Sequence, residues 1–432
     1  MLLHPAKTTS RDALNVNKNL VRYDRATIES DRSFTLHDKP MEKSNSPPPR
    51  IPPYLTLDAW RGVAALWVVM VHSCLPYIQG GHPEALHNPV FQVSVFGPLG
   101  VVMFFVISGY CVTGAAHGCI TSGKSISRYA FDRIKRIYPP YLLACAAALG
   151  VSELTSLLRT YHIIPGAHSA ARHIPSDWYF WLTNLSLTQL LFSQPSLLYI
   201  AWSLCYEVAF YFIIGTYLLF GGWLFPEDLA ARARWLLYAC GATTVISLIW
   251  LHFTPGSCPF PLNLWYQFGF GSLLFALFAG RRPDLRNTFS ILCSVACFGL
   301  GITYASFRAP WAGDIGNPPA GYQAVACLLF FAILLLLRPY DERLARMRVA
   351  QPLMWLGTIS YSVYLVHALA TPFPDAGLRR AGFDGPRYIV TYFAEIIAAV
   401  MAGWVFFILV ERHFISARQV RRIEKEIGRR GD

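Results

Sequence analysis

Ten long apolar stretches recur along this chain, and shorter polar segments separate them. Each is close to the roughly 20 apolar residues that a helix needs to cross the hydrocarbon core of a bilayer. The pattern predicts an all-α fold, a polytopic membrane helix bundle with about ten transmembrane helices. The expected spans are residues 57–78, 93–116, 139–158, 201–220, 235–252, 264–280, 288–306, 321–338, 354–371 and 388–411.

Polar segments flank the apolar region on both sides. Residues 1–53 carry mixed charge without helical periodicity and end in a proline-rich run, which predicts a disordered cytoplasmic tail. No apolar core follows the basic residues of this tail before residue 57, so we expect the first span to enter the membrane uncleaved, without a signal peptide. A membrane domain is expected at 54–412 and a basic cytoplasmic tail at 413–432.

The composition excludes a soluble globular protein of this length. Of 432 residues, 54% are hydrophobic and 14% are charged, and the mean hydropathy is +0.37. The net charge of +12 raises nucleic-acid binding as an alternative. The basic residues are instead distributed among the loops as the positive-inside rule describes. We therefore expect a lipid bilayer as partner and no nucleic acid.

The same basic residues predict the orientation of the spans. Alternate loops and the C-terminal segment hold 21 of the 37 lysines and arginines, whereas the intervening loops hold six. With both termini cytoplasmic, every basic loop lies on the cytoplasmic side, as the positive-inside rule requires. The basic segments are residues 117–140, 221–234, 281–287, 338–353 and 412–432.

The first span carries two ionisable residues, Arg61 and His72, which are eleven positions apart. At about 100° per residue this spacing turns a helix by three revolutions plus ~20° and rises roughly 16 Å, so both side chains share one face at two depths. Charged groups in hydrocarbon are costly and usually face a protein interior or a watery cavity. The alternative is that Arg61 extends to the headgroups and His72 is hydrogen-bonded within the bundle.

His72 has the chemistry of a general base, because an imidazole takes and returns a proton near neutral pH. A base needs an orienting partner, and the best candidate is Glu207, about two turns inside the external end of the fourth span. A carboxylate there is costly unless it is paired. A buried pair that only locks the bundle is the alternative for Glu207.

The second span contains several small residues within an apolar helix. Such residues let neighbouring backbones approach, and packing is the favoured interpretation of Gly97 and Gly100. Ser108 and Gly109 have a second interpretation, as the opening of a narrow passage for a slender thioester group.

Arg133 and Arg136 are i,i+3 neighbours before the third span, on a short helix that Pro139 is expected to interrupt. A paired guanidinium surface suits phosphate or pyrophosphate. A cluster that touches anionic lipid is the alternative, and charge alone favours it.

Other polar residues receive structural interpretations. His367 ends a run of tyrosines and serines at helical spacing in the ninth span, which is typical of interhelical hydrogen bonds. Glu411 and Arg412 close the tenth span, where an ion pair at the membrane boundary is expected. The ten cysteines show no CxxC spacing, and we expect those in apolar runs to be small buried hydrophobes.

Five motifs in unbroken order over about residues 55–412 resemble acyltransferase family 3, the bacterial integral-membrane O-acyltransferases of lipopolysaccharide, exopolysaccharide and related glycans. Tyr110 stands where the family commonly has Phe, and His413 where Pro is common. The motifs are Arg61-x10-His72, Phe104-Phe105-x-x-Ser108-Gly109, Arg133-x-x-Arg136, Trp202-Ser203-Leu204-x-x-Glu207 and Ser360-Tyr361-x-x-Tyr364-Leu365-x-His367.

The resemblance implies a multi-pass protein of the bacterial inner membrane with a cytoplasmic acyl-coenzyme A donor, acetyl-coenzyme A being the simplest. It implies transfer to a hydroxyl of a periplasmic or cell-surface glycan or lipid-linked saccharide, with no metal. It also implies that His72 is catalytic and that Arg61, Arg133 and Arg136 lie on the donor side.

From the residues and the resemblance together we expect the pantetheine arm to pass Ser108 and Gly109 toward His72. His72, oriented by Glu207, would then deprotonate the acceptor hydroxyl or become transiently acylated. Two other functions stay open: a transporter for a glycan or small anionic solute, which would also bury His and Glu, and a non-catalytic membrane scaffold.

Overall fold

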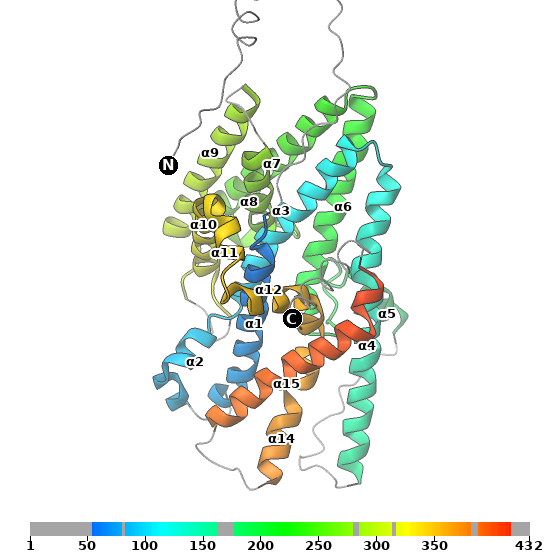
Figure 1. Cartoon of the computed structure of the whole chain (residues 1–432), viewed down its shortest axis with the longest axis vertical. Helices are drawn as coiled ribbons and strands as arrows, with labels where there is room; N and C mark the ends of the chain where they lie inside the picture. Colours follow the sequence, from blue (N-terminus) through cyan, green and yellow to red (C-terminus); the bar gives the residue numbers. More distant parts are fainter. Residues whose placement is uncertain are drawn as a thin grey trace, which may run out of the picture. The chain divides into compact units, whose positions relative to one another are not determined.

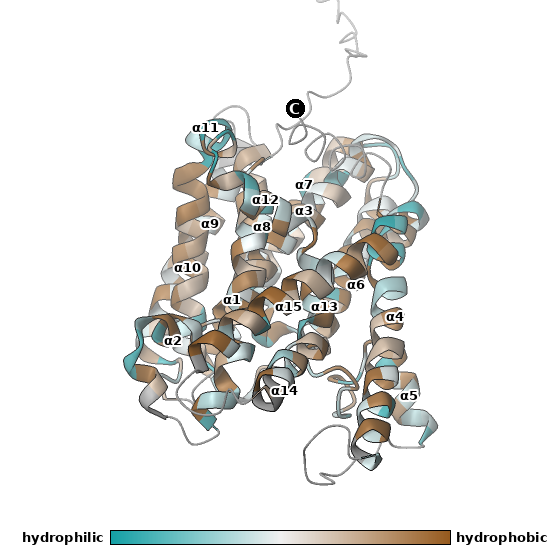
Figure 2. Cartoon of the chain, turned by 60° about the horizontal axis from the view of Figure 1, so that its bottom comes forward, coloured by the Kyte–Doolittle hydropathy of each residue, from teal (hydrophilic) through white to brown (hydrophobic). Residues whose placement is uncertain are grey.

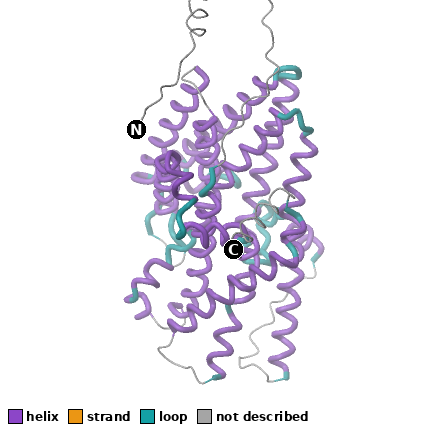
Figure 3. Tube along the Cα trace, in the orientation of Figure 1, coloured by secondary structure: helices purple, strands orange, loops and turns teal. Residues whose placement is uncertain are grey.

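The computed structural model describes residues 54–79, 83–161, 177–279, 285–312, 317–381 and 388–415. All regular structure in these ranges is helical (Figure 3). Nine of the described helices are long and apolar enough to cross a membrane, or ten if a bent pair counts as one span. The prediction of an all-α polytopic membrane bundle is confirmed. The tail expected at 1–53, and the part of the C-terminal tail from residue 416 on, lie outside the described residues.

The long helices follow the predicted spans closely (Figure 1). They are α1 (Leu57–Gln79), α3 (Leu99–Thr121), α4 (Ile126–Thr160), α6 (Ala201–Leu224), α7 (Leu229–Phe253), α8 (Leu262–Ala279), α9 (Leu285–Phe307), α10 (Ala320–Leu337) and α15 (Tyr388–Leu409). The shorter helices are α2 (Pro89–Ser94), α5 (Trp178–Leu185), α11 (Asp341–Ala345), α12 (Ala350–Thr358), α13 (Ser360–Ala370) and α14 (Pro372–Arg380), with 3-10 turns at η1 (Pro83–His87), η2 (Pro255–Ser257), η3 (Arg338–Tyr340) and η4 (Glu411–His413).

The expected interruption at Pro139 is wrong, because α4 runs through Pro139 and Pro140 without a break. Proline removes a backbone donor, but membrane helices tolerate it where neighbouring groups hold the freed backbone. Pro139 and Pro140 lack the donors that would reach the carbonyls of Lys135 and Arg136, and next to these the Tyr361 hydroxyl donates to the Ile137 carbonyl at 2.9 Å. The Tyr141 hydroxyl also anchors this part of α4, through a 2.8 Å bond to the Asn184 carbonyl.

The continuous ninth span expected at 354–371 is also wrong, because the chain bends by 77° between Ala350–Thr358 and Ser360–Leu378. The break is stabilised from both sides. The Ser360 hydroxyl donates to the Gly357 carbonyl at 2.8 Å, and the Ser362 amide at the start of α13 donates to Glu411 at 3.1 Å. A carboxylate at a helix N-terminus satisfies free backbone donors there.

Helix α1 packs against α3, α12, α13 and α15 (Figure 1). Glycines allow the closest of these contacts. A Cβ at Gly97 would lie 2.2 Å from the Trp67 carbonyl oxygen, and one at Gly100 would lie 2.6 Å from that of Ala64. The packing interpretation of Gly97 and Gly100 is therefore confirmed.

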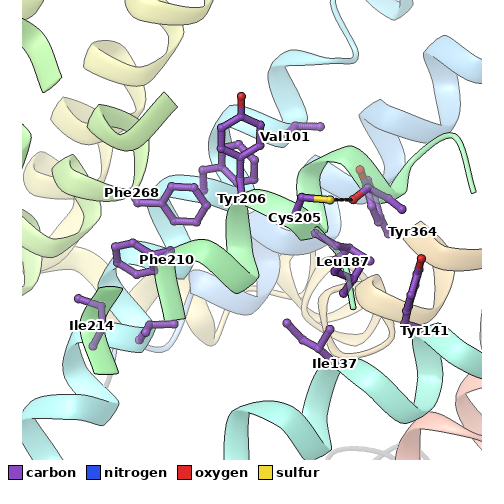
Figure 4. Packing of buried hydrophobic residues seen from close by; sticks show 14 of the residues in the cluster. Val101, Ile137, Tyr141, Leu187, Cys205, Tyr206, Phe210, Ile214, Phe268 and Tyr364 are labelled. Carbon is purple, nitrogen blue, oxygen red and sulfur yellow. Dashed lines mark hydrogen bonds between the residues drawn. The ribbon is translucent and has the colours of Figure 1, made fainter. Parts of the chain in front are cut away.

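Aromatic side chains fill the interior between α3, α6 and α8. The Phe105 ring stacks on Phe268 at 4.3 Å between centroids, and Phe268 stacks on Phe210 at 4.7 Å. Figure 4 shows Phe268 and Phe210 side by side, with Tyr206 next to them. Large apolar side chains also remain exposed on the outside of the helices, among them Phe212 and Leu336. Figure 2 shows such apolar colouring along α10 and α15 and hydrophilic colouring at α11, as expected for helices surrounded by lipid.

Candidate active site

A cavity of about 100 Å³ lies between α1, α3, α4, α6 and α13. It brings together five of the seven residues predicted for the site. Its charged lining among the described residues consists of three arginines and one glutamate, so its net charge is positive. The predicted residues that line it are Arg61, Ser108, Arg133, Arg136 and Glu207.

Arg61 is held in place within the first turns of α1. Its Nη1 donates to Asp58 Oδ1 at 2.6 Å, one turn earlier on the same helix, and its Nη2 lies 3.1 Å from the sulfur of Cys111. The Arg61 side chain is 20% exposed. Its charge is therefore already partly balanced by a carboxylate, and the guanidinium presents a fixed edge to the cavity.

Arg133 has fewer partners. Its guanidinium lies over the rings of Tyr211 at 5.8 Å and Tyr129 at 5.9 Å, and its buried Nε has no hydrogen-bond partner among the described residues. Cation–π contacts of this kind hold the orientation of a guanidinium without using its N–H donors. Arg133 and Arg136 thus bring donors to a cavity that can accept an anion.

Glu207 lies beside Ser108 and Tyr211. Its Oε1 accepts a hydrogen bond from the Ser108 hydroxyl at 3.1 Å and a second one from the Tyr211 hydroxyl. None of the hydrogen bonds described for Glu207 involves His72. Tyr199, whose ring contacts His72, lies in the turn before α6, whereas Glu207 lies in the second turn of that helix. Among the described residues, Glu207 is therefore hydrogen-bonded to Ser108 and Tyr211 and not to His72.

His72 does not line this cavity and lies next to a second imidazole. Its ring centroid is 5.0 Å from that of His367 on α13 and 6.1 Å from that of Tyr199. Tyr364 lines the cavity, and its ring is 6.0 Å from that of His367. The Tyr364 hydroxyl is hydrogen-bonded to the Ser203 hydroxyl at 2.6 Å. Tyr364 therefore lies between the arginine-lined cavity and the two histidines.

Gly109 does not line this cavity. A Cβ at this position would lie 2.0 Å from the backbone oxygen of Phe268, so Gly109 lets α3 pack closely on α8. Of the two residues predicted to open a passage for a thioester, Ser108 and Gly109, only Ser108 lines the cavity.

Glu411 does not form the expected boundary ion pair with Arg412. It is buried, and it accepts hydrogen bonds from the amide and the hydroxyl of Ser362 at 3.1 and 2.5 Å. The ion-pair prediction is wrong because the bend between α12 and α13 turns free backbone donors toward this carboxylate.

Two polar residues of the cavity, Cys111 and Tyr211, belong neither to the predicted site nor to the family motifs. Both were detectable from helical spacing. Tyr211 follows Glu207 by four residues, and Cys111 follows Ser108 by three. Tyr361 belongs to the motif that ends at His367 but was given no role in the site, and it reaches the cavity from the first turn of α13.

Two larger cavities adjoin this region. One, of about 450 Å³, shares Arg133, Ile137 and Tyr211 with the first cavity and is otherwise mostly apolar. The other, of about 650 Å³, includes Tyr199, the ring that contacts His72, and is lined chiefly by aliphatic side chains of α4 and α13. His367 thus contacts a ring that lines the arginine-lined cavity, Tyr364, and His72 contacts a ring that lines this apolar one, Tyr199.

Comparison with known proteins gives a family match over most of the chain. The family model described as an acyltransferase domain matches residues 54–411. Similar proteins include the peptidoglycan O-acetyltransferase OatA of Listeria monocytogenes, 24% identical over 348 residues that cover 73% of this chain and 50% of the relative. The exopolysaccharide production protein ExoZ of Rhizobium meliloti is 25% identical over 338 residues, covering 76% of this chain and 92% of ExoZ.

The O-acetyltransferase OatA of Staphylococcus aureus is 23% identical over 377 residues, 83% of this chain and 57% of the relative. The chain thus spans about half the length of the OatA relatives that it matches. No solved structure gives a significant match.

Proposed function

Because this chain belongs to acyltransferase family 3, we propose that it transfers an acyl group, most simply acetyl, from acyl-coenzyme A to a hydroxyl of a glycan or lipid-linked saccharide. The donor binds on the cytoplasmic side and the acceptor on the periplasmic side of the bacterial inner membrane. Relatives named as acetyltransferases of peptidoglycan, and one named for exopolysaccharide production, support a cell-envelope glycan as acceptor.

The observation that carries this proposal is the convergence of three guanidinium groups on one cavity, with His72 on the same helix as one of them. Arg61, Arg133 and Arg136 line the cavity. Coenzyme A carries a pyrophosphate and a ribose phosphate, and guanidinium groups bind such oxygens through charge-assisted hydrogen bonds. The Nε of Arg133, which has no hydrogen-bond partner in the part of the chain that the structure describes, is a donor for such a bond.

The acyl group then has to travel from the arginines toward the histidines. On α1, Arg61 and His72 are separated by a rise of roughly 16 Å, a distance suited to the extended pantetheine arm. Ser108, Glu207 and Tyr364 line the same cavity as the arginines. In this proposal Glu207 organises the donor end of the cavity, through its bonds to Ser108 and Tyr211.

His72 is the proposed general base. It removes the proton of the acceptor hydroxyl while that oxygen bonds to the thioester carbon. The carbon–sulfur bond then breaks, and the leaving thiolate receives the proton from His72. A transient acyl-imidazole on His72 would give the same products in two steps.

Replacement of His72 tests this proposal. Membranes that contain His72→Ala should fail to move label from labelled acetyl-coenzyme A to envelope glycan, because no other described side chain near the acceptor is assigned as base. General-base catalysis typically contributes about 10²–10⁴-fold. The matched control is His117→Ala, which removes a histidine of α3 that packs on Phe275.

Full transfer by His72→Ala at normal protein level would refute the proposed mechanism. Absence of labelled glycan with the unaltered protein would instead favour the transporter or scaffold function.

A further inference from the structure

His367 is a wholly buried histidine in contact with the proposed base. Its exposed fraction is 0%. The centroids of the His367 and His72 rings are 5.0 Å apart, with 40° between the ring planes. The two residues come from different helices, α13 and α1, which pack directly against each other.

Hydrogen bonds to the backbone fix the tautomer of the neutral His367 ring. Its Nδ1 lies 2.8 Å from the carbonyl oxygen of Tyr364 and 3.2 Å from that of Val363. A carbonyl oxygen can only accept, so Nδ1 carries the proton and donates it. The lone pair of the ring is therefore on Nε2.

This Nε2 is buried and has no hydrogen-bond partner among the described residues. A buried acceptor without a donor costs roughly 1–3 kcal/mol, and such atoms in folded proteins call for an explanation. Tyr364 does not supply the donor, because its hydroxyl is bonded to Ser203. The remaining polar side chain in ring contact with His367 is His72.

We propose that His367 is the positioning residue for His72, and that its Nε2 accepts a hydrogen bond from a ring N–H of His72. The inference rests on the proposed role of His72 as base. A centroid separation of 5.0 Å lets the two nitrogens reach the roughly 2.7–3.2 Å of a hydrogen bond by rotation of the His72 ring. Catalytic hydrogen bonds often tighten only when substrate is bound.

The consequence for the reaction is a defined tautomer of His72. With one nitrogen donating to His367, the other must carry the lone pair, which is then directed at the acceptor hydroxyl. When His72 takes the hydroxyl proton, the bond to His367 remains and stabilises the imidazolium. His72 returns the proton to the thiolate, and His367 neither gains nor loses one. None of the hydrogen bonds described for Glu207 reaches either histidine, since its Oε1 accepts from Ser108 and Tyr211.

Two amide substitutions at His367 distinguish a positioning role from a merely structural one. In His367→Gln the side-chain oxygen can accept near the place of Nε2, whereas in His367→Asn the amide can donate to the backbone carbonyls near the place of Nδ1. His367→Gln therefore keeps the acceptor function of Nε2, and His367→Asn keeps the donor function of Nδ1. The measurements are kcat and the KM for acetyl-coenzyme A, together with the amount of folded protein in detergent.

We expect His367→Asn to lower kcat by about 10–100-fold, the range for removal of a partner that orients a functional histidine. KM for acetyl-coenzyme A should stay unchanged, because the donor binds at the arginines. His367→Gln should keep most of kcat. The matched control is His252→Gln, at a histidine of α7 whose Nδ1 is also buried and unpartnered, and it should leave both constants unchanged.

The opposite ranking, with His367→Asn active and His367→Gln inactive, would show that the backbone bond of Nδ1 is what matters and would overturn the inference. Equal kcat in both variants would also overturn it. These outcomes leave the proposed function intact as long as His72→Ala is inactive. An active His72→Ala would instead remove the proposed function itself.

Discussion

Arg133 and Arg61 line the same cavity but differ in how far their charges are already balanced. Arg61 has a carboxylate partner in Asp58, whereas Arg133 lies between two tyrosine rings and keeps an unpartnered Nε. A guanidinium held by aromatic rings retains its donors for a ligand. Arg133 is therefore the arginine expected to contribute most to binding of donor phosphate.

Charge reversal at this position tests that expectation. Arg133→Glu should raise KM for acetyl-coenzyme A by at least about tenfold, since a charge-assisted hydrogen bond contributes roughly 1.5–3 kcal/mol, while kcat changes much less. The matched control is Lys135→Glu, which makes the same charge change at an exposed position of α4. An equal rise of KM in both variants would indicate a general surface potential rather than a contact.

At the scale of single residues, the cost of charge in hydrocarbon was the informative signal. It singled out Arg61 and Glu207, and both line the cavity. The partner of each residue was harder to predict. Helical spacing gives the depth of a side chain on its own helix but not the neighbour that it meets, so Glu207 was matched with His72 although its bonds go to Ser108 and Tyr211. The ring contact of His72 with His367 likewise depends on the packing of α1 against α13, which helical spacing does not indicate.

At the scale of helices, hydropathy and bilayer thickness predicted most spans to within a few residues. The errors concern α4, which continues through two prolines, and the ninth span, which is broken between α12 and α13. Both depend on partners far away in sequence. Tyr361 supports α4 at the Ile137 carbonyl, and Glu411 satisfies the amide of Ser362 at the start of α13. The hydropathy of one apolar stretch contains no information about its contacts with distant parts of the chain.

The contact between α1 and α12 links this break to the active site. A Cβ at Gly357 would lie 1.6 Å from the carbonyl oxygen of Asp58, the residue whose carboxylate holds Arg61. A Cβ at Gly62 would lie 2.1 Å from the carbonyl oxygen of Leu353. Any side chain at either glycine must push α12 away from α1.

Gly357→Ala should therefore destabilise the protein by about 1–3 kcal/mol, the usual cost of overpacking, and should raise KM for acetyl-coenzyme A through displacement of Arg61. Thermal unfolding in detergent and donor kinetics measure the two effects. The matched control is Gly299→Ala on α9, where a Cβ meets nothing within 4 Å. This control should be neutral or slightly stabilising, because alanine is the better helix former. Equal melting temperatures for the two variants would contradict the packing argument.

At the scale of the whole molecule, the proposal requires the two ends of one site to face opposite sides of a membrane. The arginine-lined cavity and the histidine pair lie at different depths along α1, with Tyr364 between them. The arginine-lined cavity faces the cytoplasm if the basic loops and the C-terminal segment, which together hold 21 lysines and arginines, are cytoplasmic. Coenzyme A, which is large and charged, then never has to cross, and only the acyl group moves outward.

Sealed vesicles of known orientation test this arrangement. Labelled acetyl-coenzyme A added to inside-out vesicles should support transfer to glycan in the lumen, because the cytoplasmic face is then accessible to the donor. The same addition to right-side-out vesicles should give no transfer until a mild detergent opens them, and opened vesicles of both kinds should become equal. Equal rates before opening would contradict a one-sided donor site. Activity restricted to right-side-out vesicles would reverse the orientation, and Arg61 would then lie at the outer and His72 at the inner end of α1.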